Sequence, residues 1–164
     1  MSRNFSPNQQ VHKSVVRSSG GIVASQHVGA AAIGAQVLSD GGNAVDAAVA
    51  TSFALGVLEP WMSGIGGGGL MMVRHPNGKV DTIDFGMRSP EAMRMEDYPL
   101  AEGESNELFS WPAVKDDRNM TGPLSIAVPG VVDGLGTAHA AWGSRRWAEL
   151  VAPAVRLARE GSPA

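Results

Sequence analysis

The chain has 164 residues, of which 43% are hydrophobic, and its formal net charge at pH 7 is −3. This length and apolar content suffice for one domain with a buried core. Proteins that bind nucleic acids usually carry a basic face, so the acidic balance argues against a nucleic-acid partner. The sequence has no cysteine, which excludes disulfides and thiolate metal sites. No run of about 18 uncharged apolar residues is present, which argues against a membrane span.

Residues 1–19 are polar and contain Arg3, Lys13 and Arg17 but no acidic residue. This composition predicts a flexible arm, followed by a single domain over residues 20–164. The arm contains no apolar run of the kind found in signal peptides. The expected location is therefore cytoplasmic, or periplasmic or secreted if the native N-terminus was altered.

The first predicted elements are a strand and two helices. The apolar run Gly20–Ser25 fits a strand, and apolar residues at helical spacing predict a helix over His27–Leu38. A second helix is predicted over Ala44–Val57. Asn43 is placed to cap its first amides, and Asp46 lies in the first turn, where the helix dipole favours a carboxylate. This helix is apolar on nearly all sides, which predicts that it is buried.

A β-hairpin is predicted next, with strands over Leu70–His75 and Lys79–Phe85 joined by a tight turn at Asn77-Gly78. Residues 91–119 contain eight acidic and three basic residues, which indicates a solvated excursion over the surface. Three aromatic residues are expected to order it in part, namely Tyr98, Phe109 and Trp111.

The last third of the chain is predicted to contain one strand and further helices. Ser125–Val128 fits a strand, and Val131–Trp142 fits a helix that follows the turn at Pro129-Gly130. Residues 145–159 predict either a helix pair or one kinked helix, with Pro153 in the first turn of its second part.

The sequence contains a G-x-G-x-x-G pattern at Gly64, Gly66 and Gly69. A dinucleotide-binding fingerprint follows a strand and opens a helix, whereas this run follows a helix and opens a strand. We therefore expect a turn in which backbones approach closely, without a bound cofactor.

Histidines and paired acids give no catalytic or metal site. The histidines, His12, His27, His75 and His139, have no partner at ligand spacing, so no metal is expected. The spacing of Asp81 and Asp84 does not indicate a glycosidase pair.

Several motifs follow one another between residues 20 and 161. They are GGNAVDAA at 41–48, Pro60, and the glycine run 66–69 leading into a strand. Val128-Pro129-Gly130 before a helix and Ala152-Pro153-Ala154 through Gly161 complete the series. With these motifs in this order, residues 20–161 resemble the γ-glutamyltranspeptidase family.

The resemblance implies an α+β fold, the four-layer αββα sandwich of N-terminal-nucleophile (Ntn) hydrolases, incomplete in this chain. The chain would be the N-terminal part of the large subunit of a proenzyme that cuts itself. The partner would be the small subunit of the same proenzyme, whose N-terminal threonine acts as nucleophile with its own amine as base. Two such heterodimers would form a dimer.

The catalytic threonine is expected outside this chain, which alone should be inactive. None of the threonines in the chain matches the family's cleavage context. They are Thr51, Thr82, Thr121 and Thr137. The implied activity is γ-glutamyltransferase-like amide hydrolysis or acyl transfer on a small amide or γ-glutamyl substrate.

One departure from the family concerns substrate binding. Glutamyl-specific members place an arginine directly after the returning strand, where it binds the glutamate α-carboxylate. Here that position holds Gly86, and the nearest arginine is Arg88. Two residues along a strand return a side chain to the same face about 7 Å away, so Arg88 could bind an acidic substrate from another anchor point. An equally weighted alternative makes Arg88 a solvated or ion-paired loop residue.

Three interpretations of the whole protein remain open at this point. The first is γ-glutamyl chemistry, and the second is a related amidase acting on oxamate-like or acyl amides. The third is a catalytically inactive, truncated relative. The sequence of the gene beyond residue 164 would discriminate between an enzyme and an inactive relative.

Overall fold

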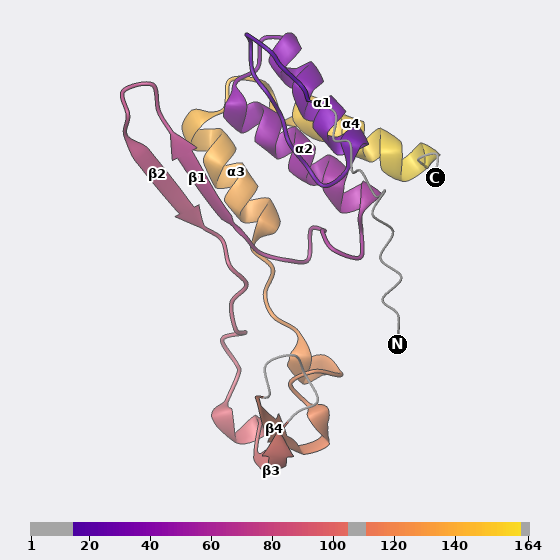
Figure 1. Ribbon diagram of the computed structural model, residues 1–164. Helices are drawn as coiled ribbons and strands as arrows, with labels where there is room; N and C mark the ends of the chain where they lie inside the picture. Colours follow the sequence, from indigo (N-terminus) through magenta and orange to yellow (C-terminus); the bar gives the residue numbers. More distant parts are fainter. Residues whose placement is uncertain (1–14, 105–110, 162–164) are drawn as a thin grey trace, which may run out of the picture.

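The computed structural model describes residues 15–104 and 111–161 and has two parts. Helices α1 to α4 and the hairpin β1–β2 form a body, and residues 87–104 and 111–128 form a smaller lobe that extends away from it (Figure 1). The predicted arm lies largely outside the described residues. Its described part, residues 15–19, is exposed.

Helices α1 (Val28–Ser39) and α2 (Ala44–Leu58) cross closely because small residues line their contact. A Cβ atom placed on Gly34 of α1 would collide with the Thr51 side chain and lie 3.2 Å from the Ala47 carbonyl oxygen. The connection between the helices turns at Gly41, whose φ is +85°, a conformation that favours glycine. Both predicted helices are confirmed.

The start of α2 is fixed by a capping box, as the sequence indicated. The Asn43 side-chain oxygen accepts hydrogen bonds from the amides of Val45 (2.9 Å) and Asp46 (3.0 Å). Asp46 returns the contact by accepting from the Asn43 amide at 2.9 Å. The helix is buried or half-buried except at Ala44 and Ser52, so its burial is confirmed apart from these two positions.

Helices α3 (Val131–Trp142) and α4 (Trp147–Glu160) complete the helical layer. The buried core joins α2, α3 and α4 and comprises Val45, Val49, Ala50, Leu135, Ala138 and Leu150. The prediction for α4 was wrong in one respect, because Pro153 lies inside a single helix rather than in a first turn. Proline removes one backbone hydrogen bond there. Burial of Leu150 and Ala154 on either side of it offsets this loss.

The predicted hairpin is confirmed, with strands β1 (Leu70–Arg74) and β2 (Val80–Asp84) pairing antiparallel. Gly78 in the turn has a φ of +87°. One face of the hairpin packs on the core, and its other face is exposed. The packed side chains are Met71, Val73 and Ile83, and the exposed apolar ones are Leu70, Met72 and Val80.

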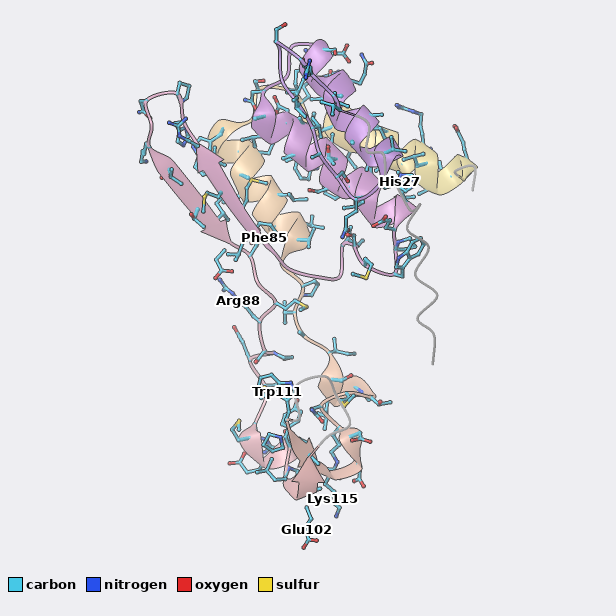
Figure 2. The ribbon with its side chains drawn as sticks, in the orientation of Figure 1. His27, Phe85, Arg88, Glu102, Trp111 and Lys115 are labelled. Carbon is cyan, nitrogen blue, oxygen red and sulfur yellow. The ribbon has the colours of Figure 1, made fainter. Side chains whose placement is uncertain are left out.

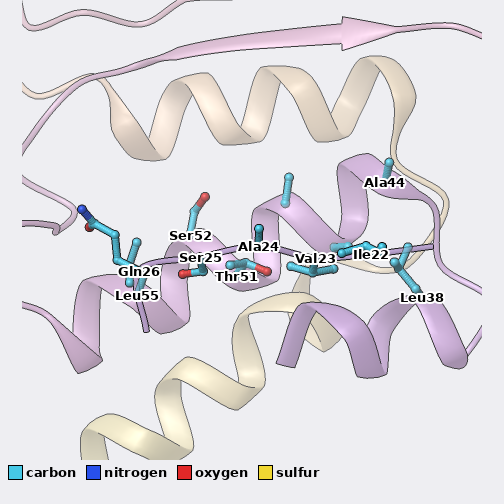
Figure 3. A pocket seen from close by; sticks show the side chains of 12 residues that line it. Ile22, Val23, Ala24, Ser25, Gln26, Leu38, Ala44, Thr51, Ser52 and Leu55 are labelled. Atoms are coloured by element: carbon cyan, nitrogen blue, oxygen red, sulfur yellow. The ribbon is translucent and has the colours of Figure 1, made fainter. Parts of the chain in front are cut away.

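The strand predicted over Gly20–Ser25 is not formed. A strand requires a hydrogen-bonding partner, and no described segment pairs with these residues. The segment instead runs along α2 (Figure 3), and a Val23 methyl group lies 3.0 Å from the position of a Cβ atom on Gly34 of α1. The segment and α2 border a groove of about 510 Å³ that includes Thr51 and Leu55.

The lobe contains two short strands, β3 (Leu100–Glu104) and β4 (Pro112–Val114), and three 3₁₀ turns, Met95–Asp97, Lys115–Asp117 and Pro123–Ser125. The strand predicted over Ser125–Val128 is wrong, since it is reduced to one antiparallel bridge between Arg88 and Val128. Of the aromatic residues expected to order this region, Tyr98 is half-buried, Trp111 is exposed, and Phe109 lies outside the described residues.

Helices with two small sheets agree with part of an α+β domain. The four-layer sandwich stays a prediction. Among the described residues, no helix has the length and apolar character needed to cross a membrane.

Candidate functional site

The glycine run lies where the body meets the lobe. Gly69 and Phe85 exchange backbone hydrogen bonds of 3.3 and 3.0 Å, which extend the hairpin by one pair. The Gly67 carbonyl oxygen accepts from the amides of Gly130 (2.9 Å) and Val131 (3.2 Å). The run therefore joins the hairpin to the first turn of α3, and it opens a strand as the sequence predicted.

Close backbone approach in this run is confirmed at particular glycines. A Cβ atom on Gly68 would lie 2.6 Å from the Met87 amide nitrogen, and one on Gly69 would lie 2.7 Å from the Phe85 ring. The Phe85 side chain also lies against Gly134 of α3, where a Cβ atom would overlap it. By contrast, a Cβ atom on Gly66 would meet no atom within 4 Å. None of these glycines has a positive φ, so space rather than backbone conformation requires them.

A cavity of about 300 Å³ opens beside this junction. It is lined by the end of β2, by Gly86 and Arg88, and by Asp133 and Thr137 on one side of α3. The Asp84 carboxylate also lines it and accepts a hydrogen bond from the Gly86 amide at 2.9 Å. The cavity thus combines one guanidinium with two carboxylates, and we call it the Arg88 cavity.

Arg88 lies in the neck between the two parts of the molecule (Figure 2). Two backbone hydrogen bonds with Val128 fix its backbone. The Arg88 amide donates to the Val128 carbonyl oxygen at 3.1 Å, and the Val128 amide donates to the Arg88 carbonyl oxygen at 2.8 Å. Its side chain is exposed and forms no ion pair or hydrogen bond with any described residue. A positioned guanidinium without a carboxylate partner can bind an anionic ligand.

The GGNAVDAA motif serves the fold rather than the Arg88 cavity. The Asp46 carboxylate is fully buried and accepts hydrogen bonds from the Ser144 hydroxyl (2.6 Å), the Ser144 amide (3.0 Å) and the Arg145 amide (3.3 Å). Asn43 donates from its side chain to the Trp142 carbonyl oxygen at 2.7 Å. The motif therefore ties the start of α2 to the connection between α3 and α4.

These hydrogen bonds also set the charge of Asp46. Burial acts to raise the pKa of this carboxyl, but the hydrogen bonds from Ser144, Asn43 and Arg145 outweigh it and hold the pKa below its ordinary value. Sequence reasoning identified the cap but missed the contact with Ser144, because the two residues are 98 positions apart. It also missed Asp133 and Thr137 as cavity residues, since neither belongs to a motif.

The threonines and histidines occupy ordinary structural positions. Thr51, Thr82 and Thr137 lie inside a helix or strand, and Thr121 is exposed in the lobe. Each described histidine has a local hydrogen-bonding partner. His27 accepts from the Gly29 amide, His75 pairs with the Asp81 carboxylate, and His139 contacts the Arg145 carbonyl oxygen. His12 is outside the described residues. In the described part of the chain, no three His, Asp or Glu side chains gather into a metal site.

Comparison with known proteins agrees with the sequence motifs. Residues 30–164 match the family model of gamma-glutamyltranspeptidase. The chain is 36% identical over 156 residues to glutathione hydrolase proenzyme 1 of Schizosaccharomyces pombe, covering 95% of this chain and 22% of that protein. It is 41% identical over 149 residues to the acylase ACY 1 proenzyme of Pseudomonas sp. strain SE83, covering 91% and 26%.

The structure agrees as well. It superposes on the crystal structure of Helicobacter pylori gamma-glutamyltranspeptidase with a TM-score of 0.79 and 32% identity, covering 91% of this chain and 40% of that one. The chain spans about a quarter of the length of the curated relatives that it matches. The chain belongs to the gamma-glutamyltranspeptidase family.

Proposed function

We propose that the full-length protein hydrolyses or transfers the acyl group of small amides, through an N-terminal threonine that lies outside this chain. The match of residues 30–164 to the family model carries the proposal. The small subunit with that threonine would be released from the same proenzyme and remain bound. The chain itself would supply part of the substrate site and no nucleophile.

In this mechanism the threonine hydroxyl attacks the amide carbonyl, and the threonine amine takes its proton. Donors aimed at the developing oxyanion stabilise the tetrahedral intermediate, and the amine product leaves with the proton that the threonine amine returns to it. Water, or a second amine in the transfer reaction, then attacks the acyl-threonine ester and releases the acyl group and the free threonine hydroxyl. Arg88 would hold a carboxylate of the substrate, because its guanidinium lines the Arg88 cavity without a described partner. This contact would orient the substrate and would not take part in the chemical step.

The second candidate is an amidase for substrates other than γ-glutamyl compounds. Gly86 occupies the position where the resemblance predicts the carboxylate-binding arginine. The likeness to an acylase proenzyme favours this candidate too. An arginine displaced by about 7 Å cannot reproduce the same bidentate contact with the same ligand. We therefore expect γ-glutamyl anilide to be a poorer substrate than butyryl anilide.

Replacement of Arg88 tests the proposed contact in the full-length protein. Arg88→Ala should lower kcat/KM for glutaryl and γ-glutamyl anilides by about ten- to a hundredfold, because one charge-assisted hydrogen bond is lost. Turnover of butyryl anilide should not change. Arg74→Ala is the matched control, since Arg74 is exposed at the far end of β1 and also lacks an ion pair with any described residue.

The opposite substitution should restore the family arrangement. Gly86→Arg is expected to raise the turnover of γ-glutamyl anilide. The backbone permits the substitution, because the φ of Gly86 is not positive. The added Cβ atom would lie 3.2 Å from an Asp84 carboxylate oxygen, so this side chain has to shift by a few tenths of an ångström. Efficient γ-glutamyl turnover by the wild type, unchanged in Arg88→Ala, would show that another part of the protein binds the carboxylate.

Maturation tests the proposed partner directly. The full-length protein should resolve into two chains by mass spectrometry, and the shorter chain should begin with threonine. Residues 1–164 alone should not hydrolyse any of the three anilides. An active protein that remains a single chain would contradict the proposed nucleophile.

A further inference from the structure

A second cavity, of about 380 Å³, lies in the lobe and also includes Arg88. Its walls are two passes of the chain, residues 87–98 and 119–127. The passes are tied together by the backbone pair between Arg88 and Val128 and by the Tyr98 hydroxyl, which donates to the Leu124 carbonyl oxygen at 2.8 Å. Both ties are formed by residues that line the cavity or adjoin it, so they join its two walls.

The lining of this cavity differs from that of the Arg88 cavity. Apolar side chains dominate it, and they are Met87, Met93, Met95, Leu124 and Ile126. Arg88 is the one charged residue among the described residues that line it. The Arg88 cavity, by comparison, also contains the carboxylates of Asp84 and Asp133. Arg88 therefore stands between a polar cavity and an apolar one.

We infer that the lobe cavity, here called the methionine pocket, binds the apolar part of a ligand whose carboxylate is held by Arg88. The ligand class is an amphipathic carboxylate, such as a medium-chain fatty acid. The inference rests on the role proposed for Arg88 and adds an apolar subsite to it.

Three features support this class of ligand. A cavity of this volume accommodates a small molecule, and sites of this kind usually combine an apolar wall with few polar groups. Methionine side chains are flexible and polarisable, so they adapt to apolar groups of different shape. Finally, no acidic side chain is among the described residues that line the pocket, so the charge of Arg88 favours an anion there.

Binding is tested with octanoate on the full-length protein labelled with ¹³C at the methionine methyl groups. Octanoate should shift the methyl signals of Met87, Met93 and Met95 and leave that of Met72 unchanged. Met72 is a matched reference because it is 75% exposed on the outer face of the hairpin. Acetate and octanamide should each bind about tenfold more weakly, since one lacks the apolar chain and the other lacks the charge.

Two variants separate the two contacts. Met93→Ser should weaken octanoate binding by about tenfold and leave acetate binding unchanged. Arg88→Gln should reduce octanoate binding to the level of octanamide. Met72→Ser, the control, should bind all three compounds like the wild type.

The inference is overturned if the three methyl signals do not move, or if Met72 moves as much as they do. It is also overturned if another segment of the protein fills the pocket and keeps these methyl groups from octanoate. Turnover of butyryl anilide reports on the proposed function separately. If the protein turns over butyryl anilide but does not bind octanoate, the pocket alone is rejected. If it binds octanoate but has no turnover, the proposed function alone is rejected.

Discussion

The body and the lobe are held together in different ways. Every fully buried residue among those described belongs to the body. No described residue between 55 and 133 is buried. In the body, small side chains let α1 and α2 approach closely, and Asp46 links α2 to the α3–α4 connection. The lobe is held by exposed hydrogen bonds such as that from Tyr98 to Leu124.

This difference indicates how stability is distributed. Regions with few buried apolar contacts open locally at a low free-energy cost, whereas a packed core opens only with global unfolding. Arg88 lies at the boundary, where a stable frame meets an adaptable lobe (Figure 2). Such an arrangement places the proposed substrate contact at the start of the lobe, just beyond the end of β2 at Asp84, and lets the lobe adjust around the ligand.

The largest effect is expected from Asp46→Ala. The substitution leaves the Ser144 hydroxyl and the amides of Asn43 and Arg145 without their acceptor in a buried place. Such a loss typically costs about 3 kcal/mol or more in the free energy of unfolding. Urea unfolding of the full-length protein measures it. Glu96→Ala in the lobe, where Glu96 is exposed, should change stability by less than about 0.5 kcal/mol. Equal effects of the two variants would remove the distinction between body and lobe.

The same carboxylate predicts a dependence on pH. The pKa of Asp46 is lowered in the folded protein. The ionised carboxylate therefore makes its full contribution to the free energy of unfolding above the ordinary aspartate pKa of about 3.9. The contribution is lost as the pH falls further, through the folded pKa. The difference in unfolding free energy between wild type and Asp46→Ala should therefore be constant from pH 7 to 5 and shrink below about pH 4. A difference that grows on acidification would contradict this assignment.

Gly68→Ala should have a smaller effect, at the junction of the two parts. Its Cβ atom would lie 2.6 Å from the Met87 amide nitrogen and 2.9 Å from the Phe85 carbonyl oxygen, both backbone atoms that cannot move freely. Overpacking of this kind costs about 1–3 kcal/mol. Gly66→Ala is the control, since no atom lies within 4 Å of its Cβ position. Thermal unfolding compares the two, and equal melting temperatures would show that the junction adapts.

Local patterns predicted the body well. The cap at Asn43, the turn at Gly78 and the helix Val131–Trp142 were all predicted from residues within a few positions of one another. Such features follow from short-range chemistry, so the sequence displays them directly. The close backbone approach of the glycine run was also predicted, but its partner atoms were not, because they come from distant segments.

Features that depend on distant partners could not be predicted from local patterns. Gly20–Ser25 has the composition of a strand but no described segment to pair with. Pro153 was expected to begin a helix, yet packing of its neighbours keeps one helix continuous through it. The Arg88 cavity brings together β2, the neck and α3, so Asp133 and Thr137 carried no local signal. The role of Arg88 itself stays a prediction.

The smallest effect is expected from Tyr98→Phe, which probes the lobe alone. The substitution removes one hydroxyl that donates to the Leu124 carbonyl oxygen at 2.8 Å and ties the two passes of the lobe together. One exposed hydrogen bond contributes about 0.5–1 kcal/mol, so amide exchange at Arg88 and Val128 should accelerate by about two- to fivefold. Exchange at Val49, in the core of α2, should not change, because the lobe opens without the body.

Ser125→Ala is the matched control for this measurement. The Ser125 hydroxyl also donates at 2.8 Å in the same region, but to Gly122, three residues away in the same pass. Its loss should leave exchange at Arg88 and Val128 as it is in the wild type, because no contact between the passes is broken. If Tyr98→Phe accelerated exchange at Val49 as well, the body and the lobe would unfold as one unit. The lobe could then not adjust to a ligand while the body stays folded.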